Sequence, residues 1–314
     1  MEIKEPFYVL DKPCVLGEGP IYRKTNNSLY YFDISSDPPQ LHILNLDPTE
    51  NNEEHVIKHR VVNLEDSVTV ARFRKNVPGS LLCAYYQGIA FLDEGTGKLQ
   101  ILREIIPKED KRIRRLNDGG IDCNGNFWIA EIDRKAYSYG ENLPDGYGKP
   151  LGRLWRYAPD GTLKMMDDGL ICGNGIAWSP DNNTMYLNDS GRHAIYAYDF
   201  DLKNSTIAKK RIFADTTKDG GQPDGMTIDI EGNIWVAMWN IGSIMIFNSN
   251  GKLQKTIRFN TKYISSLTWG GANNDILYIT SAFDAASKQK TDWGGHLFKY
   301  EPGVKGLEMN YFDK

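Results

Sequence analysis

A short unit that recurs along the chain constrains the fold more than any other feature of the sequence. Each copy opens with a polar residue and a glycine, passes an Asp/Asn/Gly turn and ends in an aromatic and aliphatic run. The clearest copies are NDGGIDCNGNFWIAEI (117–132), NGIAWSPDNNTMYLND (174–189) and DGMTIDIEGNIWVAMW (224–239). Asn, Asp and Gly tolerate the positive φ of tight hairpins, and aromatic and β-branched residues favour strands. The unit is therefore predicted to be a β-hairpin.

A second hairpin follows each unit, so that the pair supplies the four strands of one propeller blade. Weaker copies complete a set of six, which start at 18, 69, 117, 174, 224 and 265 and lie 51, 48, 57, 50 and 41 residues apart. This spacing is near the roughly 40 to 50 residues of a propeller repeat. We predict an all-β chain, a six-bladed β-propeller with four-stranded blades, in which 1–314 form a single domain. A loop at 134–152, rich in Gly, Pro and Tyr, is expected to cover one face as a lid or to be plain surface.

Composition and charge exclude several classes of function. The chain has 37 basic and 41 acidic residues and a net charge of −4. Nucleic-acid-binding proteins usually have an excess of basic residues, which this chain lacks. No stretch approaches the roughly 18 consecutive apolar residues of a membrane span, and the N-terminus has no secretory apolar segment. The four cysteines have neither zinc-site nor CxxC spacing. We expect four free thiols, a cytoplasmic location, and neither nucleic acid nor membrane as a partner.

Four polar residues occupy equivalent positions at the start of different units: Glu18, Asn117, Asn174 and Asp224. The innermost strands of a propeller run beside its axis, so these side chains are expected to converge in a central funnel. Burying ionised carboxylates without compensation is costly, and a divalent cation would balance the two negative charges of Glu18 and Asp224. Asn174 adds a neutral oxygen. Oxygen donors favour Ca²⁺, with Mg²⁺, Mn²⁺ and Zn²⁺ as alternatives, and open positions would admit water or substrate.

Two simpler interpretations stay open for the same residues. Asn-Gly and Asp-Gly pairs are common in turns, so each residue taken singly is explained as structural. A structural ion on the propeller axis would also explain why the polar residue recurs in several units.

Six segments, in order along the chain, resemble the regucalcin/gluconolactonase family, which includes the luciferin-regenerating enzymes and senescence-marker-like propellers. They are LGEGPIY (16–22), RLNDGGID (115–122), GNGIAWS (173–179), YLNDSGRHAIYAYDFD (186–201), QPDGMTID (222–229) and PGVKG (302–306). The resemblance covers nearly the whole chain and is weak only over 66–102.

This resemblance implies a propeller that holds one divalent cation in a central metal-binding funnel and hydrolyses a lactone. On the family pattern Glu18, Asn174 and Asp224 would be the metal ligands, with Asp224 also the general base. Arg115 and Asn117 would contact the substrate. A metal polarises a lactone carbonyl as negative charge develops on its oxygen, and an arginine offers a planar fork of donors.

Two positions depart from the family pattern. Glu131 stands where the family has a small glycine and is a candidate substrate-binding residue in the funnel; the alternative is an outward-facing residue that pairs with Arg134 or Lys135. Lys135 stands where sugar-lactone members have an acid, so a different lactone or ester is also a plausible substrate. Tyr137 and Trp239 are further candidates for the funnel mouth.

The sequence thus supports two functions. The first is a metal-dependent lactonase or related carboxylic-ester hydrolase that acts on a small molecule. The second is a non-catalytic calcium-binding or interaction propeller with a structural axial ion. The substrate, the physiological metal and the oligomeric state are left open by the sequence.

Overall fold

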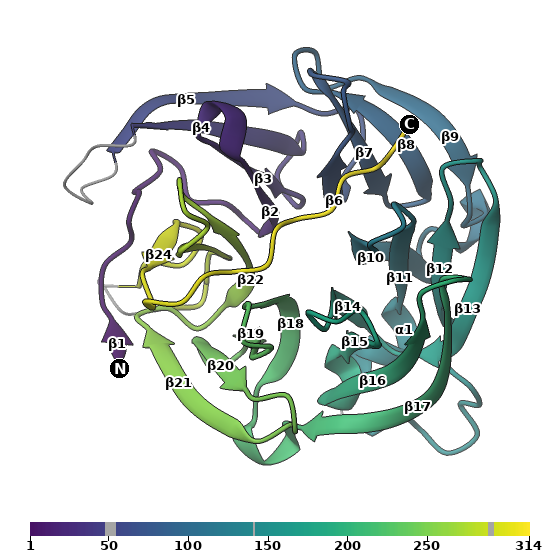
Figure 1. Cartoon of the computed structure of the whole chain (residues 1–314). Coiled ribbons are helices and arrows are strands. Elements are labelled where there is room, and N and C mark those ends of the chain that lie inside the picture. The colour runs from purple at the N-terminus through teal and green to yellow at the C-terminus, as the bar shows by residue number, and fades with distance from the viewer. Residues whose placement is uncertain (48–54, 141, 288–291) are drawn as a thin grey trace.

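The strands of the protein form six blades in a ring around a central axis, in a computed structural model that describes residues 1–47, 55–140, 142–287 and 292–314 (Figure 1). The innermost strand of each blade contacts the innermost strand of both neighbouring blades, so the ring is closed. The predicted six-bladed, all-β propeller is confirmed, and all six predicted unit starts fall in innermost strands.

The first three blades are four-stranded antiparallel sheets that run outward from the axis in chain order. The strands of blade 1 are β2 (Gly17–Arg23), β3 (Ser28–Asp33), β4 (Gln40–Asp47) and β5 (His55–Asn63). Those of blade 2 are β6 (Val68–Phe73), β7 (Ser80–Tyr85), β8 (Gly88–Asp93) and β9 (Leu99–Glu104). Those of blade 3 are β10 (Arg114–Ile121), β11 (Phe127–Asp133), β12 (Gly152–Tyr157) and β13 (Leu163–Leu170).

The last three blades follow the same order with variations at the outer edge. Blade 4 has β14 (Gly173–Trp178), β15 (Thr184–Asp189), β16 (Ala194–Asp201) and β17 (Thr206–Asp215). Blade 5 has β18 (Gln222–Ile228), β19 (Ile234–Trp239), β20 (Ser243–Phe247) and β21 (Leu253–Phe259), and blade 6 has β22 (Ile264–Gly270), β23 (Ile276–Ser281) and β24 (Phe298–Tyr300). Short helices are η1 (Lys24–Asn26), η2 (Lys108–Asp110), α1 (Arg134–Ser138), η3 (Ser190–Arg192) and η4 (Thr217–Asp219).

The N-terminal segment accounts for the two departures from four strands per blade. Strand β1 (Glu2–Ile3) adds in parallel to β21 and makes blade 5 five-stranded. Blade 6 has three strands in the described part of the chain, and an antiparallel bridge between Tyr8 and Leu297 extends its outer edge. The N-terminal segment therefore extends the outer edges of blades 5 and 6 before the chain enters blade 1.

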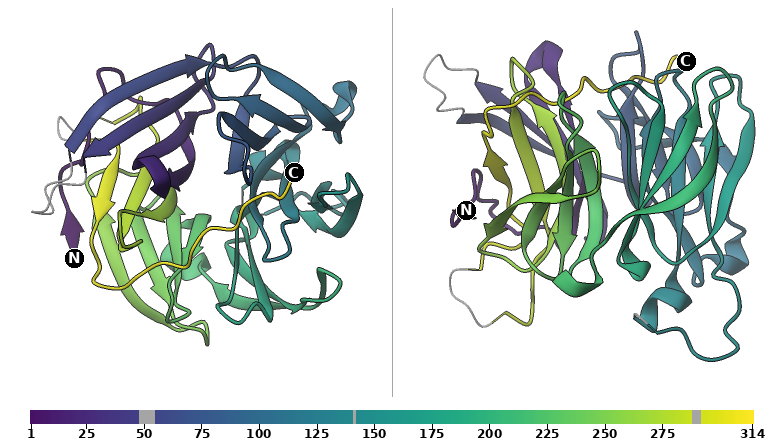
Figure 2. Two further views of the ribbon diagram at one scale, coloured as in Figure 1. Left: turned by 45° about the horizontal axis from the view of Figure 1, so that its top comes forward. Right: turned by 60° about the horizontal axis from the view of Figure 1, so that its bottom comes forward.

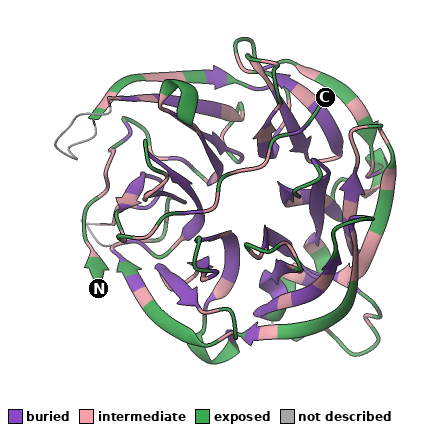
Figure 3. Ribbon diagram, in the orientation of Figure 1, coloured by how far each residue is buried: buried purple, intermediate pink, exposed green. Residues whose placement is uncertain are grey.

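Each interface between neighbouring blades has its own hydrophobic cluster. Blades 3 and 4, for example, pack Trp128 and Ala130 against Ile176, Trp178 and Leu187. The inner strands are mostly buried, whereas long stretches of the outer strands are exposed (Figure 3). Burying apolar side chains between blades is the main source of stability in such a fold, because the polar backbone is already paired within each sheet.

The two faces of the ring carry different segments. The C-terminal segment crosses one face (Figures 1 and 2). The loop that begins with α1 projects from the other face, seen at the bottom of the right-hand view of Figure 2. In the described residues no helix has the length and apolar composition needed to cross a membrane.

Candidate functional site

Every innermost strand has a break in its pairing register at the predicted site position. In β2 the break lies between Glu18 and Ile21, and in β18 it lies between Pro223 and Met226. Comparable breaks follow Leu116 in β10 and Gly173 in β14. A β-bulge leaves a residue out of the ladder and re-aims its side chain. Since the innermost strands line the axis, the bulges explain how segments far apart in sequence present Glu18, Asn117, Asn174 and Asp224 toward one another.

Three carboxylates share this end of the axis. Burial raises the pKa of Glu18 well above its ordinary value, and the charges of Asp224 and Asp118 raise it further. Burial and the charge of Asp118 likewise raise the pKa of Asp224. The charge of Arg115 lowers the pKa of both Glu18 and Asp224. The structure therefore brings Glu18 and Asp224 together, as predicted, and adds Asp118.

Asp224 and Asn174 are held by a chain of hydrogen bonds from blade 4. Asn174 hydrogen-bonds to the Asp224 carboxylate, and its Nδ2 also donates to Ser190 Oγ at 3.0 Å. Ser190 Oγ donates to the carbonyl of Pro223 at 2.7 Å, and Asn188 Nδ2 donates to the carbonyl of Asp224 at 2.5 Å. These contacts fix the backbone of β18 against β14 and β15. The two site residues are thus positioned by the same pair of blades.

Arg115 and Asn117 form a second rigid element of the site. Arg115 Nη1 donates to Asn117 Oδ1 at 2.5 Å and to the Leu116 carbonyl at 2.9 Å. Asn117 Nδ2 donates to the Gly173 carbonyl, next to Asn174, at 2.9 Å. Because both ends of the Asn117 amide have partners, its main contribution in this structure is to hold Arg115 and to tie blade 3 to blade 4.

The donor set fits a divalent cation by its charge. Burial raises the pKa of all three carboxylates, and the charge of Asp118 adds to the shifts of Glu18 and Asp224, so a divalent cation would supply electrostatic compensation. Among the described residues, however, no three His, Cys, Asp or Glu side chains form a group that could hold a metal ion. A site here would therefore need the Asn174 amide oxygen in addition to Glu18 and Asp224, and water would complete the coordination.

Glu131 does not join this group. Its side chain is fully buried on β11, where Trp155 Nε1 donates to it at 2.6 Å and Arg114 Nη1 lies 3.4 Å from its other oxygen. Burial raises its pKa, while Trp155 and Arg114 oppose the shift. The expected alternative partners were Arg134 or Lys135, and Arg114 takes that place. A role for Glu131 in substrate binding stays a prediction without a supporting contact.

The loop after β11 reaches over the site from blade 3 to blade 5. Tyr137, on α1, donates its hydroxyl to Gln222 Oε1 at 2.7 Å. Burial raises the pKa of Tyr137, and the charges of Cys172 and Asp224 add to this while Arg115 opposes it. Tyr137 therefore lies at the mouth of the funnel. Trp239 pairs with Gln222 in the β18–β19 ladder and packs against Tyr263, with ring centroids 4.4 Å apart.

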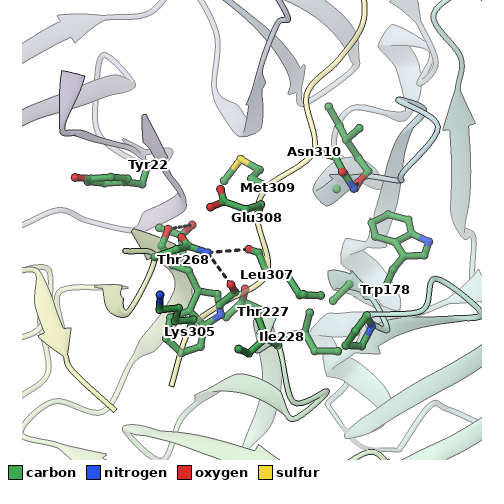
Figure 4. Close-up of a pocket in the computed structure, with 18 of the residues that line it drawn as sticks. Tyr22, Trp178, Thr227, Ile228, Thr268, Lys305, Leu307, Glu308, Met309 and Asn310 are labelled. Atoms are coloured by element: carbon green, nitrogen blue, oxygen red, sulfur yellow. Dashed lines mark hydrogen bonds between the residues drawn. The ribbon is translucent and has the colours of Figure 1, made fainter. Parts of the chain in front are cut away.

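A cavity of about 690 Å³ lies toward the opposite end of the axis. Its walls include Tyr22, Trp178 and Thr268, and Leu307 and Met309 of the C-terminal segment lie across it (Figure 4). Arg72 lines this cavity and its charge also lowers the pKa of Asp118, so Arg72 stands between the cavity and the carboxylates. The cavity and the carboxylates thus lie on different sides of Arg72. We place the candidate functional site at the carboxylates.

Sequence reasoning missed several residues of the site. Asp118 directly follows Asn117 in RLND and could have been included from that position alone. Ser190 and Asn188 lie in a different hairpin from the residues they support, and nothing in their local sequence shows that contact. The position of Tyr86 beside Arg115, with the ring centroid 5.0 Å from Cζ, was likewise not signalled.

Comparison with known proteins places this site in a family. The profile described as the SMP-30/gluconolactonase/LRE-like region matches residues 16–283, which include every candidate ligand. The chain belongs to this family. The SMP-30/gluconolactonase/LRE-like assignment confirms the resemblance drawn from the six motifs.

Similar proteins extend the comparison across nearly the whole chain. Regucalcin of Xenopus laevis is 27% identical and the match covers 97% of each chain. Pentonolactonase of Haloferax volcanii is 28% identical, with 95% of this chain and 94% of the relative covered. A solved luciferin-regenerating enzyme superposes with a TM-score of 0.81 at 28% identity, over 96% of each chain. The relatives include a named lactonase, which supports a lactonase type of function for the family.

Proposed function

We propose that this protein is a divalent-metal-dependent lactonase that opens the ring of a small-molecule lactone with water. The observation that carries the proposal is the group of Glu18, Asp118 and Asp224, three mutually repelling carboxylates at one end of the propeller axis. Membership of the SMP-30/gluconolactonase/LRE-like family and similarity to a pentonolactonase support the same reaction.

Glu18, Asn174 and Asp224 would hold the cation, with Ca²⁺ as the first expectation and Mg²⁺, Mn²⁺ or Zn²⁺ as alternatives. When bound, such an ion supplies Lewis-acid polarisation of the lactone carbonyl. The hydrogen bonds from Asn188 to the Asp224 carbonyl and from Asn174 to Ser190 would keep the donors in place.

Asp224 would act as general base. Its carboxylate takes a proton from a water molecule while the water oxygen bonds to the carbonyl carbon of the lactone. The ring C–O bond then breaks, and the departing oxygen takes up the proton, which gives the hydroxy acid.

Arg115 would contact the substrate through its guanidinium. Its Nη1 is already anchored by Asn117 and by the Leu116 carbonyl, so the planar fork is held in one orientation at the edge of the carboxylates. An arginine so placed stabilises negative charge that develops on the substrate oxygen.

The proposal is tested by measuring turnover of a panel of sugar and aliphatic lactones after metal removal and on return of single cations. We expect no turnover in chelator and recovery with a divalent ion. Asp224→Asn should lower kcat at least about a hundredfold, as for loss of a general base. Asp201→Asn, an exposed turn residue of blade 4, serves as the matched control. Unchanged turnover in Asp224→Asn would contradict the mechanism.

A non-catalytic calcium-binding propeller is the second candidate, favoured by the same carboxylate group and by the similarity to regucalcin. Both functions predict that the cation raises the melting temperature, since a ligand that binds the folded state stabilises it. They differ in turnover: the second predicts stabilisation with no hydrolysis of any lactone or ester. A cytoplasmic location is part of the proposal, because all four cysteines are free thiols.

A further inference from the structure

Two arginines flank one aromatic ring on the face that carries the candidate site. Tyr86 follows β7, and its carbonyl accepts a hydrogen bond from the Leu116 amide at 2.9 Å, which places it beside the start of β10. Arg115 Cζ lies 5.0 Å and Arg134 Cζ 5.1 Å from the centroid of the Tyr86 ring. Both arginine side chains are half-buried. They approach the site from two elements, β10 and the first residue of α1.

Neither guanidinium forms an ion pair among the described residues, although the charge of Arg115 acts on Glu18 and Asp224 from a distance. Within the described parts of the chain, no ion pair joins Arg115 or Arg134 to a carboxylate, whereas the adjacent Arg114 contacts both Asp110 and Glu131. Arg134 Nε is buried and has no hydrogen-bond partner among the described residues. A buried donor without an acceptor carries its desolvation cost uncompensated. The carboxylates of Asp110 and Glu131 thus pair with Arg114 and not with Arg134.

The charges of the two arginines act on each other. Burial lowers the pKa of Arg134, and the positive charge of Arg115 lowers it further, while Tyr86 acts in the opposite direction through its charge and a hydrogen bond. Two like charges held near one another in a half-buried place favour an anion between or beside them. Planar guanidinium forks match carboxylate and phosphate oxygens in particular.

We propose that Arg134 and Arg115 form an anion-binding subsite at the rim of the funnel, and that the preferred substrate is a lactone with a carboxylate or phosphate on its side chain. The inference rests on the proposed lactonase function and narrows its substrate class. Arg115 faces the reacting carbonyl from the carboxylate side, and Arg134 binds the anionic substituent farther from the axis. The exposed Lys135, whose Nζ lies 5.9 Å from the Tyr147 ring, takes no part.

The test compares lactones that differ in one substituent. The probes are gluconolactone, the same lactone phosphorylated on its terminal hydroxyl, and glucarolactone, in which a carboxylate replaces the terminal hydroxymethyl group. We expect the wild-type protein to have the higher kcat/KM for one or both anionic lactones, which identifies the substituent. In Arg134→Gln this preference should fall about tenfold or more through KM, the loss typical of a charge-assisted hydrogen bond.

Two further variants separate a binding role from a structural one. Arg134→Lys keeps the charge and should retain part of the preference. Lys135→Gln removes one positive charge from the next residue of the same helix and should keep all of it. An equal loss of preference in Lys135→Gln and Arg134→Gln, or wild-type kcat/KM values that do not favour an anionic lactone, would overturn the inference while leaving the lactonase proposal intact.

A binding measurement tests the subsite independently of turnover. By calorimetry, wild-type protein should bind glucarate, with two carboxylates, more tightly than gluconate, and Arg134→Gln should remove the difference. Selective glucarate binding without any lactone hydrolysis would support the subsite and contradict the proposed function. Equal affinity for the two anions in the wild-type protein would contradict the subsite.

Discussion

At the scale of single residues, the candidate site gains its chemistry by placing carboxylates where they destabilise the fold. The pKa values of Glu18 and Asp224 are raised by burial and by neighbouring carboxylates. A carboxylate whose pKa is higher in the folded than in the unfolded protein lowers stability above its unfolded pKa, because the folded state must give up its proton at greater cost. Function and stability therefore oppose each other at these positions.

This opposition predicts that the metal-free fold gains stability when either aspartate of the site loses its charge. In metal-free protein at neutral pH, Asp224→Asn should raise the free energy of unfolding by about 1 kcal/mol, because it removes a repelling charge. Asp118→Asn should raise it by a smaller amount, because burial raises the pKa of Asp118 too but the charge of Arg72 opposes that shift. Denaturant titration in chelator measures both. A fall in the free energy of unfolding in either variant would contradict the charge arrangement.

A second residue-scale prediction concerns His42 in blade 1. Its Nδ1 lies 3.0 Å from His59 Nε2, its Nε2 has no partner in the described chain, and burial followed by the charge of His59 lowers its pKa from 6.5 to about 3. Below pH 6.5 His42 binds a proton in the unfolded state but not in the folded state. The free energy of unfolding therefore falls as the pH drops toward 3. The contribution is about 1.4 kcal/mol per pH unit.

In His42→Phe the free energy of unfolding should depend less on pH between about pH 6 and pH 4, by about 1.4 kcal/mol per pH unit. Denaturant titration at several pH values measures this dependence. Ile57→Gln, an exposed position of β5 without a titratable side chain, is the control and should keep the wild-type slope. If His42→Phe and wild-type protein lose stability in parallel over this range, the buried neutral state of His42 is not the cause. A smaller variant such as His42→Gln serves the same measurement if phenylalanine does not fit.

At the scale of the element, an aspartate in the hairpin turn of two blades binds both the turn backbone and a buried tryptophan. Asp229 accepts hydrogen bonds from the amides of Glu231 and Asn233, and from Trp235 Nε1 at 2.9 Å. Asp122 makes the equivalent contacts, with Trp128 Nε1 at 2.8 Å. One carboxylate thus closes the turn and anchors the tryptophan that fills the interface between blades. These contacts explain why the spacing D-x-x-G-N-x-W recurs in the sequence.

Removing that carboxylate should have a large effect. Asp229→Ala leaves two turn amides and a buried indole without an acceptor, and we expect a loss of about 2 to 4 kcal/mol in the free energy of unfolding. Asp181→Ala, in the exposed turn of blade 4 where Asp181 accepts from Ser179 and Asn183, should cost less than about 1 kcal/mol. Thermal or denaturant unfolding measures the difference. Similar losses for both variants would show that the tryptophan contact is not decisive.

The elements also show where prediction from sequence succeeds. Hairpins and their order were predictable because turn residues and alternating strands are local signals, and the six starts fixed which strands are innermost. The bulges at Glu18 and Asp224 made the predicted residues converge. Contacts set by packing between distant segments had no local signal: the hydrogen bond from Tyr137 to Gln222 and the one from Asn188 to the Asp224 carbonyl each depend on how two hairpins meet.

At the scale of the whole molecule, the two chain ends fasten the ring in different ways. The N-terminal segment adds β1 to blade 5 and the Tyr8 bridge to blade 6. The C-terminal segment leaves blade 6, pairs Gly306 with Asp229 of blade 5, and ends against blade 2, where Arg74 pairs with Phe312. It therefore ties together blades that do not touch, on the face opposite the candidate site (Figure 1).

Phe312 anchors the end of the C-terminal segment to blades 2 and 3. Its side chain is fully buried in the cluster between blades 2 and 3 and stacks on Tyr157, whereas the adjacent Tyr311 is 42% exposed. Phe312→Ala should cost about 3 to 5 kcal/mol in the free energy of unfolding through lost burial and the remaining cavity, and Tyr311→Ala should cost much less. Because the anchor lies on the face opposite Glu18 and Asp224, the dissociation constant for the cation should be unchanged in Phe312→Ala at temperatures where the variant is folded. A loss of cation affinity that matches the loss of stability would mean instead that the carboxylates depend on the C-terminal tie for their positions.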